Sequence, residues 1–240
     1  MKFLLDVHTH TIASGHAYST FQENVAAAKE KGLQIYGVSE HGPAMPDAPY
    51  LFHFQNLRVL PRRMEGILIL RGAEANIIDV DGTIDMQPST IESLDYLLAS
   101  MHLPCINSMS REENTLAMIN TMAHPLVKII GHPDDSRYPL DYDRLAKAAG
   151  EAGVALEVNN SSLSPTSFRA NAKENVTEML RACMKYGTYV VANSDAHISY
   201  DVGNFKNTFA LFEAANFDPE LILNTNTERF LRFIGYKEDL

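Results

Sequence analysis

Short apolar runs alternate with amphipathic stretches along the whole chain. Runs of four or five mostly apolar residues, bounded by polar or turn-forming residues, predict short strands buried on both faces. Such strands are predicted at residues 3–7, 35–38, 67–71, 96–99, 127–130, 155–158 and 189–192. The pattern therefore indicates strands that are covered on both sides.

The amphipathic stretches between these runs predict helices. They span residues 20–31, 110–122, 141–152, 172–186, 205–215 and 227–233. Thr20 with Glu23, and Ser110 with Glu113, have the spacing of a capping box, which marks a helix start. Residues 77–84 predict a small hairpin, and residues 41–63 a long loop with one short helix.

About seven strand–helix units predict a parallel sheet with helices outside it. An open, doubly wound sheet and a closed barrel both satisfy this order. The barrel is favoured because nearly every predicted strand ends in a residue that can bind a metal, and a barrel brings those ends to one face. We expect a single α/β domain over residues 1–240, because no repeat or linker interrupts the pattern.

Seven histidines and two carboxylates lie at or just after these strand ends. They are His8, His10, His16, His41, Glu74, His102, His132, Asp195 and His197. Imidazole and carboxylate together suit zinc, manganese or iron. This set exceeds what one ion accepts, so it predicts two or three ions with a bridging carboxylate. Metals of this kind generate a nucleophile from water at neutral pH and stabilise the leaving side of a displacement.

A single histidine at a strand end is more often structural or merely exposed than a ligand. The motifs HxH, GHP and DxH, each at a strand end, are hard to obtain from core packing alone. Clustering so many polar groups would be costly without a charged partner. His53 and His124 fall outside the pattern: we interpret His124 as structural, and His53 as exposed without function rather than as a substrate contact.

The formal net charge is −10, with 20 basic and 30 acidic residues. This balance argues against a general surface for long nucleic acids or anionic membranes. No apolar window is long enough to span a bilayer, and no signal-peptide core fits before Asp6, so we expect a cytoplasmic protein. Cys105 and Cys183 are expected to be reduced thiols. The oligomeric state is left open.

At these motifs the sequence resembles the polymerase and histidinol phosphatase (PHP) family. His8 and His10 match the family's first motif, and His41, His132 and the Asp195–His197 pair match later ones. The resemblance runs from residue 1 to about 235 and is strongest to the small single-domain bacterial phosphoesterases. It implies a distorted (β/α)7 TIM-like barrel holding three divalent transition-metal ions, with zinc expected first and manganese or iron as alternatives.

The resemblance also implies a ligand set for each ion. The first ion would be bound by His8, His10, Glu74 and Asp195, the second by Glu74, His102 and His132, and the third by His16, His41 and His197. Glu74 would bridge the first two ions. Glu74, Asp195 and His197 are the residues expected to serve catalysis.

Substrate contacts are expected in the loop after the sixth strand. Asn160 and Ser161, within residues 159–162, would either hold substrate oxygens or form a turn. Arg169 in the same loop is expected to bind phosphate, because its guanidinium makes paired hydrogen bonds; a solvated loop arginine is the alternative. Arg62 and Arg63 are weaker candidates for the same role.

The expected function is hydrolysis of phosphate monoesters of small metabolites by metal-activated water, since no serine or cysteine with a partnered base is visible. A phosphodiesterase or nuclease acting on short oligonucleotides is one alternative. An amidohydrolase-like enzyme is another, although the lysine ligand usual in that class is missing from these strand ends. A non-catalytic metal-binding module is the third. The physiological substrate is left open.

Overall fold

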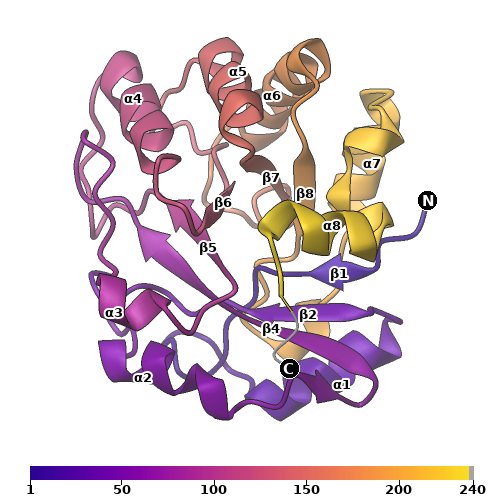
Figure 1. The fold of residues 1–240 in the computed structure, drawn as a ribbon. Helices are drawn as coiled ribbons and strands as arrows, with labels where there is room; N and C mark the ends of the chain where they lie inside the picture. Colours follow the sequence, from indigo (N-terminus) through magenta and orange to yellow (C-terminus); the bar gives the residue numbers. More distant parts are fainter. Residues whose placement is uncertain (238–240) are drawn as a thin grey trace.

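The computed structural model describes residues 1–237, and its centre is a parallel sheet curved into a nearly closed barrel (Figure 1). Seven strands pair in chain order, all in parallel. They are β1 (Leu5–Asp6), β2 (Ile35–Val38), β4 (Ile67–Asn76), β5 (Tyr96–Ser100), β6 (Val127–Ile130), β7 (Ala155–Asn159) and β8 (Val190–Asn193). The predicted barrel is confirmed. The largest difference from the predicted strands is in β4, which continues through Glu74 to Asn76.

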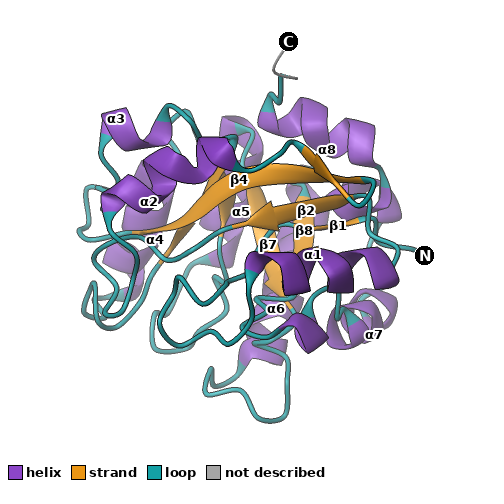
Figure 2. Ribbon diagram, turned by 90° about the horizontal axis from the view of Figure 1, so that it is seen from below, coloured by secondary structure: helices purple, strands orange, loops and turns teal. Residues whose placement is uncertain are grey.

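Helices surround the strands on the outside (Figure 2). They are α1 (Phe21–Glu30), α2 (Leu51–Asn56), α3 (Pro88–Ile91), α4 (Arg111–Thr121), α5 (Tyr142–Ala152), α6 (Ala172–Tyr186), α7 (Lys206–Ala214) and α8 (Thr227–Ile234). Both predicted capping boxes form, at the start of α1 and of α4. Within residues 1–237, no helix has the length and apolar character needed to cross a membrane.

The two edge strands of the sheet, β1 and β8, meet through few contacts. Just beyond the strands, the backbone of His10 donates to Ala196 O (2.9 Å), and that of Asp195 donates to His8 O (3.0 Å). At the strands themselves the buried side chain of Asn224 fills the gap. Its amide donates to Leu5 O (3.0 Å) and Ala192 O (2.7 Å), and its oxygen accepts from Ala192 N (2.7 Å). The Asn224 side chain thus takes the place of direct hydrogen bonds between β1 and β8 and links these two strands.

The barrel interior is a packed core at the end where the strands begin. Apolar side chains of the strands meet Phe230 and Ile234 of α8, which crosses in front of the barrel in Figure 1. Tyr96 spans this interior and donates its hydroxyl to Val7 O (2.7 Å). It fits because Gly37 and Gly72 have no side chain, and a Cβ at either position would collide with its ring or hydroxyl. This end is closed, which leaves the opposite end for a site.

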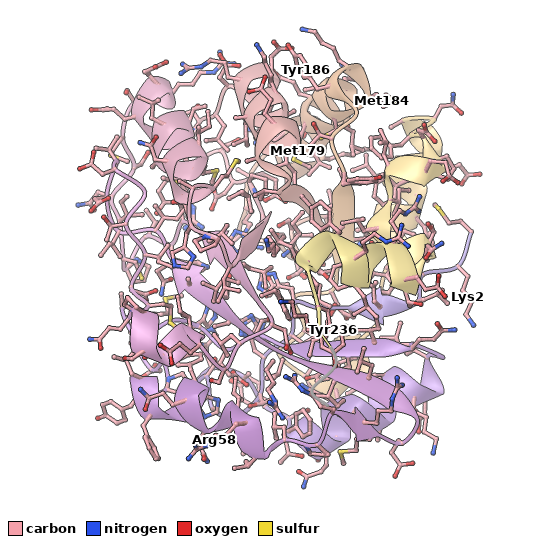
Figure 3. All side chains as sticks on the ribbon, in the orientation of Figure 1. Lys2, Arg58, Met179, Met184, Tyr186 and Tyr236 are labelled. Carbon is pink, nitrogen blue, oxygen red and sulfur yellow. The ribbon has the colours of Figure 1, made fainter. Side chains whose placement is uncertain are left out.

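A second core lies between the sheet and the helices. Met179 of α6 is fully buried in it, whereas Met184 on the same helix is 38% exposed (Figure 3). Tyr186, at the end of α6, donates its hydroxyl to Asp143 of α5 (2.7 Å). Neighbouring helices are thus joined at their outer ends as well as through the core.

The segment after β2 differs from the prediction. Besides α2 it contains the strand β3 (Arg63–Met64), which pairs antiparallel with the start of β4. Arg62 lies at the end of the barrel where the strands begin. Its guanidinium donates a hydrogen bond to Asp95 (2.7 Å) and lies 5.8 Å from the ring centroid of Tyr236. The prediction of Arg62 and Arg63 as phosphate contacts was wrong, because both lie at the end where the strands begin. The predicted hairpin at residues 77–84 is reduced to one antiparallel bridge between Ile77 and Ile84.

Candidate metal centre

All nine side chains predicted from the strand ends come together at the open end of the barrel. His8 and His10 follow β1, His41 follows β2, Glu74 lies within β4, and His102, His132 and the Asp195–His197 pair follow β5, β6 and β8. His16 comes from the loop after β1. Six of the nine are buried, while His102 and His197 are partly exposed and His16 is exposed.

Glu74 occupies the centre of the cluster, with imidazoles facing both of its oxygens. Oε1 lies 3.3, 3.4 and 2.8 Å from the Nε2 atoms of His8, His102 and His132, respectively. Oε2 lies 2.6 Å from His41 Nδ1 and 3.6 Å from His10 Nε2. A carboxylate whose two oxygens serve different groups of nitrogens has the arrangement of a bridging ligand.

The two oxygens of Asp195 face different groups of side chains. Oδ1 faces the Nε2 atoms of His8 and His10 at 3.5 and 3.3 Å. Oδ2 accepts from the Asn159 amide (3.1 Å) and from Arg169 Nη1 (3.3 Å). One oxygen is therefore directed at the histidines, while the other is fixed by two donors.

Four histidines form the outer part of the cluster. The His10 ring lies 4.2 Å from that of His41 and 4.4 Å from that of His197, between ring centroids. His16 lies 4.9 Å from both His41 and His197, and its Nε2 is 3.1 Å from His41 Nε2. The exposed His16 thus joins the buried residues through its two neighbours.

Several buried polar atoms in the cluster have no hydrogen-bond partner. They are His8 Nε2, both ring nitrogens of His10, His41 Nδ1 and Glu74 Oε2. Leaving a buried polar group unpaired costs about 1–3 kcal/mol. His41 Nδ1 and Glu74 Oε2 approach to 2.6 Å without hydrogen-bond geometry. Nitrogen and carboxylate oxygen atoms that converge without pairing fit divalent transition-metal ions.

Four triads in the cluster have ligand atoms within 4.8 Å of one another. They are His8–His10–Glu74, His8–His132–Asp195, His10–His41–His197 and His41–Glu74–His102. The first belongs entirely to one predicted ligand set, and the other three combine residues of different sets. The distribution of ligands over individual ions therefore stays a prediction.

Glu157 of β7 is a buried residue of the site that the sequence reasoning missed. Its Oε1 accepts from His8 Nδ1 (2.7 Å) and the Asn193 amide (2.8 Å), and its Oε2 from His132 N (2.7 Å) and the Asn159 amide (3.1 Å). With Nδ1 of His8 donating to Glu157, Nε2 is free to bind a metal. An acidic residue inside an otherwise apolar strand was the available signal.

Two further buried residues hold the histidines in place. Asn76 Oδ1 lies 2.7 Å from His102 Nδ1, which directs the other ring nitrogen toward Glu74. Glu40 accepts hydrogen bonds from Thr11 N (3.0 Å) and Ser14 Oγ (2.6 Å), and thereby fixes the loop between His10 and His16. The sequence reasoning gave neither residue a role.

The electrostatics of the cluster favour charged carboxylates. Burial opposes ionisation of Glu74, but the surrounding His8, His102 and His41 outweigh it and hold its pKa well below the usual value. Asp195 is shifted in the same direction, because His8, His10 and Arg169 outweigh its burial. Burial, together with the neighbouring His41 and His197, lowers the pKa of His10 and so favours the neutral imidazole, the form that binds a metal.

The three predicted substrate residues in the loop after β7 have different surroundings. The side chain of Arg169 is 8% exposed, and its Nη1 donates to Ser162 Oγ (2.9 Å) as well as to Asp195. Asn160 Oδ1 accepts from the backbone of Asn207 (2.9 Å) and so helps to position the start of α7. Ser161 is exposed and lines a small cavity beside Asp195.

The two histidines excluded from the pattern lie outside the cluster. His124 accepts from Leu126 N (3.3 Å) in the turn before β6, which agrees with a structural role. His53 lies on α2 and is partly buried, whereas an exposed side chain was expected. Neither belongs to any of the four triads.

Comparison with known proteins identifies the family of this chain and full-length relatives of it. The PHP domain model matches residues 6–161, and a PHP-associated model matches residues 174–227. The chain is 45% identical over 239 residues to a probable phosphatase of Acetivibrio thermocellus, covering 100% of this chain and 98% of that one. It is 40% identical over 240 residues to a probable phosphatase of Clostridium novyi, with the same coverage.

Solved structures with low sequence identity share the fold. Histidinol phosphate phosphatase from Lactococcus lactis, solved with zinc, L-histidinol and phosphate, has a TM-score of 0.62 and 17% identity over 91% of this chain and 95% of that one. A chain of an archaeal ribonuclease P solved with mature tRNA has a TM-score of 0.61 and 14% identity, over 97% and 90% of the two chains.

The fold is that of an α/β barrel, and the full-length relatives place the chain among the hydrolases of the phosphatase class. The chain belongs to the PHP domain family, as its resemblance to that family indicated.

Proposed function

We propose that this chain hydrolyses phosphate monoesters of small metabolites at a site of three divalent metal ions, with zinc as the first candidate and manganese or iron as alternatives. The observation that carries the proposal is the environment of Glu74. Five imidazoles surround its two oxygens, and several buried nitrogen and oxygen atoms of this group have no hydrogen-bond partner. The full-length relatives named as probable phosphatases support the reaction class.

The chain's own residues supply the ligands and their orientation. When bound, the ions would provide an activated water and neutralise the charge of the phosphate. Glu74 would bridge two ions, Asp195 would offer Oδ1, and Glu157 and Asn76 would hold His8 and His102 with Nε2 directed inward. Because these contacts preset the ligand positions, binding requires little rearrangement of the barrel mouth.

Arg169 would orient the phosphate. Its Nη1 is engaged by Ser162 and Asp195, whereas a guanidinium offers five N–H donors in a fixed fork, so the others are available to a phosphate oxygen. A guanidinium beside the ligand Asp195 adds direction that metal ions alone do not give. His197 would act both as a ligand and as a catalytic group at the partly exposed rim.

Arg169→Ala should lower kcat/KM for phosphomonoesters about 10–100-fold, equivalent to a charge-assisted hydrogen bond of about 1.5–3 kcal/mol. Arg169→Lys should recover only part, because a point charge cannot make paired contacts. Steady-state kinetics with metal content measured in parallel provides the test, and Arg181→Ala on the exposed face of α6 is the control. An unchanged kcat/KM in Arg169→Ala would eliminate the phosphate role.

The function itself is tested by a screen of phosphomonoesters, phosphodiesters and amides. We expect turnover of monoesters, its loss on chelation and its recovery with added zinc or manganese. A preference for diesters or amides, or no turnover of any monoester by metal-loaded protein, would overturn the proposal.

A further inference from the structure

A small cavity of about 220 Å³ adjoins Asp195 at the barrel mouth. One wall is the loop after β7, and the other runs from the end of β8 to the first turn of α7. Because Asp195 is part of the lining, a group in this cavity lies next to the candidate metal centre. Pockets for drug-sized ligands have about 300–1,000 Å³, so this one suits a smaller group.

The wall formed by the β7 loop carries a series of hydroxyl groups. Ser161, Ser164, Thr166 and Ser167 all line the cavity. Ser164 Oγ and Thr166 Oγ1 lie 2.9 Å apart, and Ser167 Oγ accepts from Arg169 N (3.1 Å), which ties this wall to the proposed phosphate contact. Each hydroxyl offers one donor and two acceptor sites, so capacity remains for a ligand.

The opposite wall carries amides. Asn204 and Asn207 line it, and their side-chain hydrogen bonds to Lys206 N and Asn160 O are both long, at 3.4 Å. A carboxamide donates and accepts at the same time, as a hydroxyl does. Both walls therefore match a partner that bears several hydroxyl groups.

The charge of the lining is acidic. Asp195 and Asp201 are its ionisable residues within the described chain, and no lysine or arginine lines it. Arg169 compensates Asp195, whereas the carboxylate of the exposed Asp201 has, among the described residues, one long hydrogen bond of 3.4 Å from the Asn204 amide. A second anionic group on a bound molecule would meet Asp201 without a cation to pair with it.

We infer that this cavity receives the leaving alcohol of the substrate, and that it selects small hydroxylated alcohols without a negative charge through its serine, threonine and asparagine side chains and Asp201. The inference rests on the proposed phosphatase function and specifies its substrate class. The phosphate would be held at the metal centre beside Arg169, with the alcohol in the cavity. Asp201 is a specificity-determining residue in this arrangement, because like charges placed together disfavour the wrong partner.

The test uses substrates that differ in one group. Glycerol 1-phosphate and 3-phosphoglycerate share a three-carbon skeleton, and the second has a carboxylate where the first has a hydroxymethyl group. We expect kcat/KM of the metal-loaded protein to favour glycerol 1-phosphate at least about tenfold, a ratio that one unfavourable charge contact of moderate strength produces. Asp201→Asn should narrow that ratio several-fold, whereas Glu213→Gln, which removes a charge from α7, should leave it unchanged.

Each outcome has one meaning. Equal kcat/KM for the two substrates, or a ratio that Asp201→Asn does not alter, would overturn the inference while leaving the phosphatase function intact. No turnover of either substrate or of any other phosphomonoester would instead contradict the proposed function. Ser161→Leu gives an independent check: it fills part of the cavity and should raise KM for glycerol 1-phosphate, and an unchanged KM would count against the assignment.

Discussion

Replacing Glu74 with glutamine should lower phosphatase activity more than about 100-fold and reduce the metal content of the purified protein. Loss of a residue that merely supports a metal ligand already costs about 10–100-fold, and Glu74 is proposed to bind two ions directly. Glutamine keeps the shape of the side chain but removes its charge, and only one of its two terminal atoms can bind a metal. Kinetics and elemental analysis of the same preparation measure both effects.

Glu74→Ala should be at least as severe, and Glu178→Gln on the exposed surface of α6 serves as the control for a lost charge. Circular dichroism separates a folded, metal-poor variant from an unfolded one. Wild-type turnover in both Glu74 variants would refute the bridging role of this residue.

Glu157→Gln should weaken metal binding about 10–100-fold, although Glu157 is not proposed to touch a metal. Its carboxylate accepts hydrogen bonds from four donors, two at each oxygen. A glutamine would direct an NH₂ group at one pair of these donors and leave buried groups unpaired, at about 1–3 kcal/mol each. His8 would lose the partner that orients its ring.

Titration of the metal-free variant with zinc, beside wild type and Glu178→Gln, measures this effect. The free energy of unfolding of the metal-free proteins should also fall in Glu157→Gln. If the variant binds zinc with wild-type affinity, Glu157 contributes to packing alone.

Local patterns made the barrel predictable. Each apolar run and each amphipathic stretch is decided by neighbouring residues, and the capping boxes at Thr20 and Ser110 formed as their spacing predicts. The nine candidate ligands could also be predicted from local sequence. Residues that directly follow the strands of a barrel lie together at one end of it. Their convergence required the fold class and no detailed knowledge of packing.

The missed features depend on contacts between residues distant in the sequence. Asn224 joins β1 to β8 from more than 30 positions beyond Ala192, and nothing near it in the sequence marks that role. Glu157 was predicted to lie in a strand and was given no function, because its partners His8 and His132 follow other strands, β1 and β6. Arg62 and Arg63 were misplaced because the short strand β3 returns the chain to the closed end of the barrel.

The most direct test of the metal-dependent phosphatase is elemental analysis and phosphatase activity measured on one sample of the full chain, before chelation, after it and during stepwise return of zinc or manganese. We expect about two to three transition-metal ions per chain, activity that disappears with them, and recovery that follows metal occupancy. Full phosphatase activity in protein with only trace metal would contradict this expectation.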